Sequence, residues 1–342
     1  MTEIRQNILY VTKQNTWLHH DLEVVKVDYE GKTIFQVPIH HLEGIALFGV
    51  ISVSSSLMYK ALERGVSISW LTEWGKFLGR VEGVASGNVL LRREQFRKAD
   101  DPAFRTALSK RLVAGKIRNT RLNLLRAARD IGEAETGSIE YALKEMARCL
   151  EKLEFADSGD TVRGLEGMAA KYYYDNFNYM IRQQKEDFCF DGRNRRPPKD
   201  RVNSLLSFFY ALMTNDCVSA LQSVGLDPFV GYLHCERPGR PSLALDLMEE
   251  FRSFADRVTL SIINLKQVTA NDFVEKPGSV FFMKDDIRKE IIKIWQTKKQ
   301  DEIHHELLDR KCRIADLPHL QARILARTIR GDLKDYQPFL WR

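Results

Sequence analysis

Residues 225–252 read Gly-Leu-Asp-Pro-Phe-Val-Gly-Tyr-Leu-His-Cys-Glu-Arg-Pro-Gly-Arg-Pro-Ser-Leu-Ala-Leu-Asp-Leu-Met-Glu-Glu-Phe-Arg, and the rest of the chain is organised around them. Gly225 is typical of a helix stop. His234 then enters a loop rich in Gly and Pro, and Ser242 is predicted to cap the next helix. Because such a loop can fold back, the histidine is expected to approach that helix.

Three acids of this helix, Asp246, Glu249 and Glu250, share one face at i, i+3 and i, i+4 spacing. Like charges so placed destabilise a helix by roughly 0.2–0.5 kcal/mol per pair unless a cation lies there. An imidazole with carboxylates suits Mg²⁺ or Mn²⁺. Alone, a histidine is usually structural and such acids usually form a solvated helix face, but apolar residues between these acids make full solvation unexpected.

A metal site needs a further ligand, and Glu166 is the candidate. Gly164 and Gly167 flank it within a helical pattern, where each glycine costs about 1 kcal/mol relative to alanine. That cost is explained if another backbone or a ligand must come close. The alternative is a glutamate in a first helical turn, favoured by the helix dipole.

The composition indicates a globular protein. The chain has 342 residues, 44% of them hydrophobic, which is enough for two domains with a sizeable core. No apolar run approaches the ~18 residues that span a bilayer, and the first residues do not resemble a signal peptide. The five scattered cysteines lack Cys-x-x-Cys spacing, which argues against disulfides and structural zinc. We therefore expect a cytoplasmic protein that does not bind membranes.

The patterning predicts an α+β fold with a β-rich domain at residues 1–85 and an α-helical domain at 86–342. Strand-like runs cover 7–12, 23–29, 32–38, 43–48, 66–71 and 76–82, with a hairpin turn at Glu30-Gly31. The first domain is expected to stabilise the chain or to form a homodimer. Helices are expected at 54–64, 104–129, 137–155, 161–184, 203–224, 242–265, 284–310 and 316–332.

Positive charge is concentrated in residues 90–130, which hold twelve Lys or Arg against four acids, a net +8, while the whole chain is +6. Such concentration indicates a polyanion partner. Phosphate contacts of this kind position DNA without reading its sequence. The candidate DNA-binding residues are Arg92, Arg93, Arg97, Arg193, Arg195 and Arg196, and for each of them a solvated helix face is an equal alternative.

Several motifs, in order, resemble the Cas1 family of CRISPR-associated spacer-acquisition integrases. They are Ser-Gly-Asn-Val-x-Leu-Arg-Arg-Glu-Gln-Phe at 86–96, Gly-Leu-Glu-Gly-Met-Ala-Ala-x-Tyr-Tyr at 164–173, Arg-Asn-Arg-Arg-Pro-Pro-Lys-Asp-Arg-Val-Asn-Ser-Leu-Leu-Ser-Phe at 193–208 and the stretch at 225–252. The resemblance covers essentially the whole chain. The closing Tyr-Gln-Pro-Phe-Leu-Trp-Arg looks like the type I-C branch of the family.

The resemblance implies a catalytic metal site, with Mg²⁺ or Mn²⁺ held by Glu166, His234 and Glu249. Asp246 is implied as a possible accessory ligand that binds directly or through water, and Glu250 as a bystander. The family varies between Asp and Glu at the third ligand, and this chain has Asp-x-x-Glu.

The implied activity is metal-dependent DNA integration or endonuclease cleavage in antiviral CRISPR adaptation. The 3′-hydroxyl of a short captured DNA attacks a phosphodiester at the edge of a CRISPR repeat. The implied partners are double-stranded DNA (prespacer and repeat), a second copy of the chain, the small companion subunit Cas2 and an accessory exonuclease.

Two other functions fit the same residues. A stand-alone metal-dependent nuclease would cut branched or linear DNA without joining strands. A non-catalytic DNA-binding scaffold would give His234 no reason to lie beside the acids.

Overall fold

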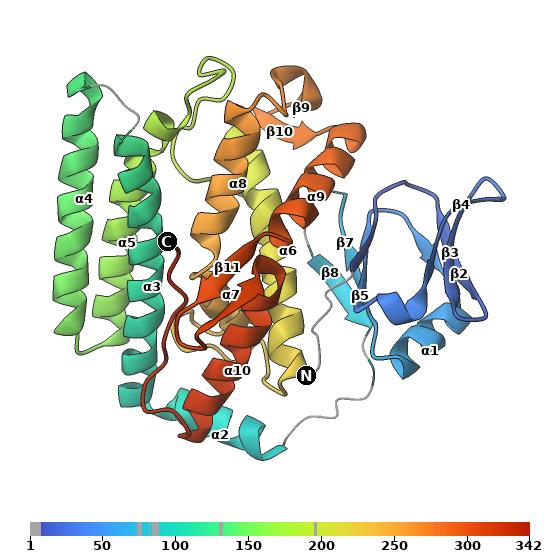
Figure 1. Ribbon diagram of the computed structural model, residues 1–342, viewed down its shortest axis with the longest axis horizontal. Coiled ribbons are helices and arrows are strands. Elements are labelled where there is room, and N and C mark those ends of the chain that lie inside the picture. Colours follow the sequence, from blue (N-terminus) through green and yellow to red (C-terminus); the bar gives the residue numbers. More distant parts are fainter. Residues whose placement is uncertain (1–7, 74–76, 82, 84–88, 130–132, 195–196) are drawn as a thin grey trace. The chain divides into compact units, whose positions relative to one another are not determined.

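The computed structural model describes residues 8–73, 77–81, 83, 89–129, 133–194 and 197–342. The chain forms two compact units (Figure 1). The first contains residues 1–86, 283–301 and 313–316, and the second contains the remainder. The first segment of the first unit ends near residue 86, where the sequence pattern changes from strand-like to helical. The chain returns to the first unit twice after residue 86.

The first unit contains two four-stranded sheets, ordered β1-β5-β7-β8 and β4-β3-β2-β6. Strands β1, β5 and β7 are parallel, and β8 closes that sheet antiparallel. The strands are β1 Ile8–Val11, β2 Trp17–Asp21, β3 Val24–Tyr29, β4 Lys32–Pro38, β5 Gly44–Phe48, β6 Ser52–Val53, β7 Ser67–Leu71 and β8 Phe77–Val81.

Apolar side chains from both sheets and from α1 (Ser55–Glu63) form one core in this unit. Leu18, Val25, Ile45 and Leu57 are fully or almost fully buried in it. The hairpin predicted between β3 and β4 is confirmed, and both its turn residues have positive φ, 50° at Glu30 and 75° at Gly31. The sequence did not predict β2, whose Trp-Leu-His-His-Asp lacks a β-branched run.

The second unit is mostly helical, so the predicted α+β class is confirmed. Its helices are α2 Val89–Asp100, α3 Pro102–Ala128, α4 Glu133–Glu154, α5 Gly159–Asp175, α6 Arg201–Ser223, α7 Ser242–Met248, α8 Arg252–Asn264 and α10 Leu317–Arg330. Helix α3 begins sharply because Asp101 caps it and Pro102 occupies its first turn. Helices α3, α4 and α5 pack side by side in Figure 1.

Helix α6 is the central helix of the second unit. By length and composition it could cross a membrane, but 72% of its most apolar window is buried inside the protein. Such burial is what a core helix shows. The helix predicted at 203–224 is confirmed, and the structure shows that it is buried.

Several local expectations are wrong. The helix predicted at 161–184 ends at Asp175 as α5. The helix predicted at 242–265 is interrupted at residues 249–251, between α7 and α8. The helix predicted at 284–310 ends at Lys299 as α9 (Asp285–Lys299), and a hairpin of β11 (Glu302–His305) and β12 (Arg310–Arg313) follows. Ser242 does not cap α7, because its hydroxyl donates to the Cys235 carbonyl at 3.1 Å instead.

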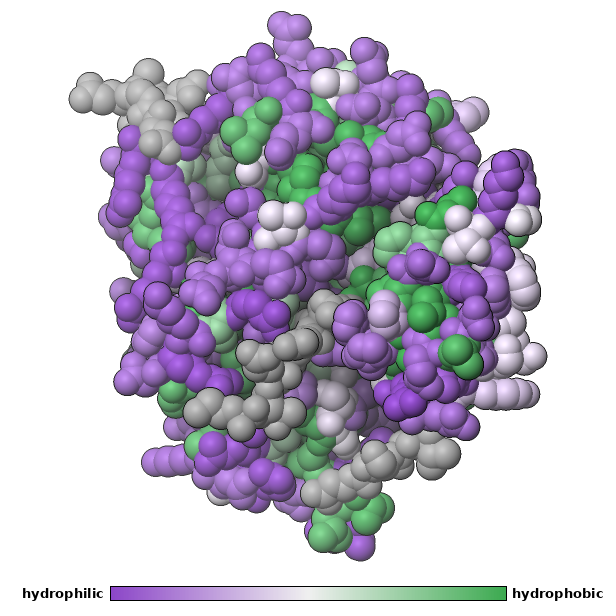
Figure 2. All heavy atoms as spheres, turned by 45° about the vertical axis from the view of Figure 1, so that its right-hand side comes forward, coloured by the Kyte–Doolittle hydropathy of each residue, from purple (hydrophilic) through white to green (hydrophobic). Residues whose placement is uncertain are grey.

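A second hairpin, β9 (Phe273–Lys276) with β10 (Val280–Met283), precedes α9. Figure 2 shows a surface that is mostly hydrophilic, with hydrophobic residues exposed in separate patches. Scattered apolar exposure of this kind is normal for a folded protein.

Candidate metal site

The predicted site residues meet in the second unit. Glu166 lies on α5, His234 in the loop before α7, and Glu249 at the break between α7 and α8. Lys116 of α3 reaches the same place. Four segments that are far apart in the sequence therefore supply one cluster.

Asp246 holds the loop that carries His234. Its Oδ2 accepts hydrogen bonds from the backbone N–H groups of Tyr232 (2.6 Å) and Leu233 (3.1 Å). Its Oδ1 accepts from the His234 N–H at 2.9 Å and lies 2.7 Å from His234 Nδ1. These four contacts use the lone-pair directions of a carboxylate. Asp246 therefore orients the imidazole so that Nδ1 faces it and Nε2 faces Glu249.

Gly231 allows this arrangement. A Cβ at residue 231 would lie 2.7 Å from Ser242 Cβ, 2.9 Å from Ser242 C and 3.1 Å from Asp246 Oδ2. Backbone and carboxylate approach this glycine too closely for any side chain. The loop can therefore pack directly on the first turn of α7.

Glu249 is the centre of the cluster and is only 2% exposed. Its Oε1 accepts from Arg252 Nε at 2.9 Å and lies 3.8 Å from His234 Nε2. Its Oε2 lies 2.7 Å from Lys116 Nζ. Burial raises the pKa of Glu249, but Arg252, Lys116 and His234 outweigh burial and hold it well below its usual range. The carboxylate is therefore ionised at neutral pH.

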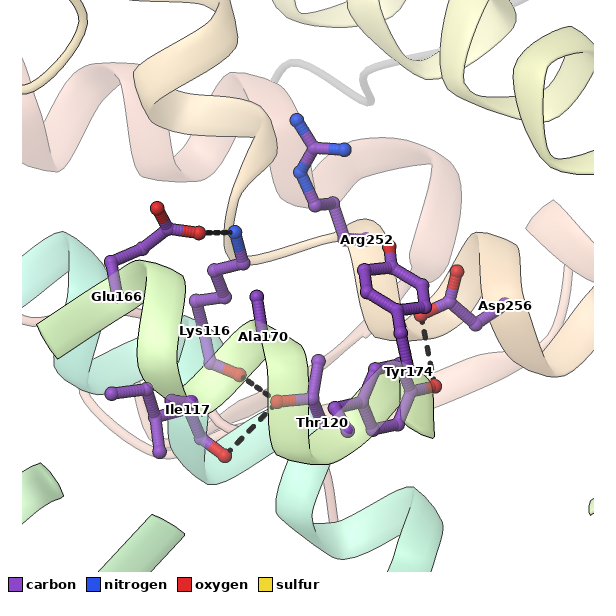
Figure 3. Close-up of a pocket in the computed structure, with 10 residues that line it drawn as sticks. Lys116, Ile117, Thr120, Glu166, Ala170, Tyr174, Arg252 and Asp256 are labelled. Atoms are coloured by element: carbon purple, nitrogen blue, oxygen red, sulfur yellow. Dashed lines mark hydrogen bonds and ion pairs between the residues drawn. The ribbon is translucent and has the colours of Figure 1, made fainter. Parts of the chain in front are cut away.

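Lys116 joins Glu166 to Glu249. Figure 3 shows its ammonium directed at the Glu166 carboxylate, with which it forms a hydrogen bond. Burial lowers the pKa of Lys116, but Glu249 and Glu166 raise it above its ordinary value. The sequence analysis counted Lys116 only among the twelve basic residues of 90–130 and did not place it in the site.

Arg252 is the second residue that the sequence analysis missed. Its guanidinium lies 4.8 Å from the Tyr210 ring centroid. Burial lowers the pKa of Arg252, but Glu249 outweighs burial and leaves that pKa raised. The i, i+3 spacing from Glu249 was a signal that could have suggested the pair.

The donor set suits a divalent cation. Glu249 Oε2 is buried without a hydrogen bond of good geometry, although Lys116 pairs with it electrostatically. The predicted ligands would be this oxygen, His234 Nε2 and the Glu166 carboxylate, a mixed set that Mn²⁺ or Mg²⁺ accepts. Among the described residues, no three His, Cys, Asp or Glu side chains already form a metal cluster. Lys116 lies between two of the acids.

Glu250 points away from this cluster and binds the C-terminal segment. It accepts hydrogen bonds from Tyr336, from Gln321 Nε2 (2.7 Å) and from the Phe339 N–H (2.7 Å). Trp341 donates its indole N–H to the Glu250 carbonyl at 3.1 Å. The apolar C-terminal segment therefore docks within its own chain.

Asp256 lies behind the site, beside a cavity of about 10 Å³ that Lys116 and Glu166 also line (Figure 3). It accepts hydrogen bonds from Tyr173 (3.0 Å) and Tyr210 (2.5 Å). Burial raises the pKa of Asp256 to about 6. These tyrosines are part of the core.

The candidate DNA-binding arginines differ in their surroundings. Arg93 is exposed, Arg97 pairs with Glu94 at 3.5 Å, and Arg92 donates to the Gly225 carbonyl at 3.3 Å. Arg193 is held by α6, donating to Asn203 Oδ1 at 2.6 Å and to Ser207 Oγ at 3.1 Å. Arg195 and Arg196 lie outside the described residues.

Comparison with known proteins agrees with this fold. The family profile described as "CRISPR associated protein Cas1" matches residues 9–297. The chain is 44% identical over 338 residues to the "CRISPR-associated endonuclease Cas1 1" of Moorella thermoacetica, covering 98% of each chain. The α+β architecture is thus that of a CRISPR-associated protein class. The chain belongs to the Cas1 family.

Other relatives extend the comparison. A "CRISPR-associated exonuclease Cas4/endonuclease Cas1 fusion" from Geobacter sulfurreducens is 32% identical over 341 residues, covering 98% of this chain and 60% of the fusion. Two solved structures share the fold. A "Casposase bound to integration product" has a TM-score of 0.85 at 21% identity, covering 97% of this chain and 93% of that one. A chain of a "Cas6-RT-Cas1--Cas2 complex" has a TM-score of 0.84 at 22% identity, and the match covers 99% of this chain and 36% of that one.

Proposed function

We propose that this chain is a metal-dependent DNA integrase and endonuclease of CRISPR adaptation. Glu166, His234 and Glu249 would hold one Mg²⁺ or Mn²⁺. The observation that carries the proposal is the convergence of these three residues, from three segments, on one partly buried point. Relatives named as endonucleases and a casposase with the same fold support DNA as the substrate.

The protein's own groups have distinct roles in the proposed reaction. Asp246 fixes the imidazole so that Nε2 is presented, and Arg252 keeps Glu249 ionised and oriented. A bound divalent cation would supply Lewis-acid polarisation of a backbone phosphate. The reaction is a transesterification in which a DNA 3′-hydroxyl forms one P–O bond while the P–O bond at the repeat edge breaks. Asp246, whose oxygens are all engaged, is proposed to position His234 and not to bind the metal.

We propose the assembly from the same comparisons. The proposed partners are double-stranded DNA, a second copy of the chain and Cas2. Cas2 is proposed because a structural neighbour is part of a complex with Cas2. The Cas4 fusion supports an accessory exonuclease. The protein would act in the cytoplasm. The type I-C-like assignment, which depends on the closing seven residues, stays a prediction.

Integration into a repeat-bearing plasmid tests the proposal. A duplex with free 3′-hydroxyls is incubated with the protein, Cas2 and Mg²⁺ or Mn²⁺, and strand-joined products are measured. We expect Glu166→Gln, His234→Ala and Glu249→Gln each to reduce joining about 100-fold or more. Glu290→Gln, the same change at an exposed acid of α9, should leave it unchanged. Normal joining by His234→Ala would refute the assigned site.

The products separate the alternatives. Cut fragments without joined strands would indicate the stand-alone nuclease. The non-catalytic scaffold is less well supported, because His234 does lie beside Asp246 and Glu249. DNA binding with neither cutting nor joining, unaffected by Glu166→Gln, would favour the scaffold.

A further inference from the structure

Lys116 occupies an unusual position for a lysine of a basic helix. Its Nζ pairs with Glu166 and lies 2.7 Å from Glu249 Oε2, and its side chain is only 12% exposed. Two other basic residues of α3 bind neutral groups. Lys110 donates to the carbonyls of Glu154 (2.5 Å) and Ala156 (3.1 Å), and Arg121 donates to that of Leu143 (3.1 Å). Lys116 instead bridges two proposed metal ligands.

An ammonium and a divalent cation cannot share these oxygens. Mg²⁺ binds carboxylate oxygens at about 2.0–2.1 Å, and the Lys116 ammonium already lies within hydrogen-bond distance of the same groups. Two positive centres on one carboxylate pair would repel each other strongly in a buried site. The lysine, however, has a flexible four-carbon stem, which lets its charge move while its backbone stays in α3.

The carboxylate pair also needs a cation of some kind. Glu249 is 2% exposed, and removing one partner from a buried ion pair leaves an uncompensated charge that destabilises the fold. Arg252 satisfies Oε1 of Glu249 at 2.9 Å, while Lys116 is the cation at Oε2. Lys116 is thus placed to hold Glu166 and Glu249 together whenever no metal does.

We infer that Lys116 is a built-in competitor of the divalent cation, which must displace the ammonium from Glu166 and Glu249 in order to bind. This inference rests on the proposed metal site. It adds that metal affinity is set partly by α3, and that Lys116 stabilises the protein only while the metal is absent.

Metal binding by variants tests the competition without any activity measurement. Mn²⁺ affinity is measured by calorimetry on the full chain, and unfolding temperature is measured in chelator and in saturating Mn²⁺. If the ammonium-paired state is about nine-tenths populated, it weakens the apparent affinity about tenfold. We therefore expect Lys116→Met to bind Mn²⁺ about tenfold more tightly than the natural chain. Its unfolding temperature should fall in chelator and recover in Mn²⁺.

Two variants serve as controls. Lys116→Arg keeps the cation and should bind Mn²⁺ much as the natural chain does. Lys171→Met makes the same charge change at an exposed lysine of α5, 72% exposed and paired with Asp175, and should change neither quantity. Unchanged or weaker Mn²⁺ binding by Lys116→Met would overturn the inference. Absence of Mn²⁺ binding by the natural chain would overturn the proposed metal site and this inference with it.

A measurement on the natural chain avoids dependence on a folded variant. The rate of acetylation of Lys116 by an N-hydroxysuccinimide ester is followed by mass spectrometry, with Lys110 as the internal reference. Displacement predicts that Mn²⁺ accelerates modification of Lys116 severalfold relative to Lys110. An equal or slower rate in Mn²⁺, under conditions where calorimetry shows binding, would exclude displacement while leaving the metal site intact.

Discussion

Asp246 shows how a residue can serve a site without touching its ligand. Its four acceptor contacts hold three consecutive backbone N–H groups and His234 Nδ1. Such orienting partners typically change metal affinity 10–100-fold when removed. We expect Asp246→Asn to weaken Mn²⁺ binding by about that factor, because an amide must direct N–H groups at other donors.

Calorimetric titration with Mn²⁺ checks this expectation. Asp286→Asn, the same change at a fully exposed acid of α9, is the control. The unfolding temperature in chelator should also fall for Asp246→Asn, because buried N–H groups lose their acceptor. Mn²⁺ affinity equal to that of the natural chain would contradict the positioning role.

Asp256 makes the stability of the protein depend on pH. Its pKa is raised from 3.8 to about 6 by burial, while in the unfolded chain it has its ordinary value. As pH rises from about 4 to about 6, the unfolded chain loses this proton first, so stability falls over that window and then levels off. Asp256→Asn removes this dependence.

Urea unfolding in chelator between pH 4 and 7 measures the effect. At each pH the unfolding free energy of the natural chain is compared with that of Asp256→Asn. As pH rises across the window, the natural chain should lose about 2–3 kcal/mol of stability relative to this variant. A difference that is constant with pH would show that Asp256 has no raised pKa.

The sequence pattern predicted the histidine and the acidic residues of the site but not the basic side chains around them. His234, Glu166 and Glu249 stand out because an imidazole or carboxylate near apolar residues is rare. Lys116 and Arg252 do not stand out, because a helix with many basic residues gives no sign of which one turns inward. Only the packing of α3 against α5 and α8 selects Lys116.

Gly164 and Gly167 of helix α5 are exposed. The sequence predicted that either another backbone or a ligand comes close to them. A Cβ at Gly164 or Gly167 would meet no atom within 4 Å, so no other backbone comes close, and that half of the prediction is wrong. The other half, a ligand that approaches this face beside Glu166, stays a prediction. The uncovered helix surface there would allow DNA to reach the site closely.

Gly167→Ala separates stability from ligand approach. We expect the unfolding free energy to rise by about 1 kcal/mol, because alanine favours the helix, while strand joining falls. Gly137→Ala, at another open helical glycine in α4, should stabilise without affecting joining. Thermal unfolding and the plasmid assay together test this, and unchanged joining by Gly167→Ala would mean that DNA stays clear of α5.

Helix positions were predicted better than helix ends. The pattern of 242–265 continues through residues 249–251, so periodicity alone predicts one helix. The break coincides with contacts to distant parts of the chain, since Glu250 binds the C-terminal segment and Glu249 pairs with Lys116. The hairpin after Lys299 was missed because Glu-Ile-His-His lacks a strong strand signal.

At the scale of the whole molecule, we expect the proposed homodimer to form through the β-rich unit. Strand β4 is an edge of its sheet. Its Phe35 is 51% exposed and Ile34 is 48% exposed. The register shifts between Val27 and Asp28, leaving Ile34 as a bulge opposite them. A bulged edge resists direct strand pairing, so contact through these exposed side chains is the favoured mode.

We expect the protein in solution to have about twice its 39.6 kDa chain mass, and Phe35→Lys to reduce it to that of one chain, because a charge cannot be buried there without a partner. Light scattering after size exclusion measures both. Leu22→Lys, at a residue 83% exposed beyond the end of β2, should leave the dimer intact. If Phe35→Lys also remains a dimer, a surface other than β4 joins the copies. A natural chain that is a monomer at all concentrations would instead remove homodimerisation from the proposed assembly.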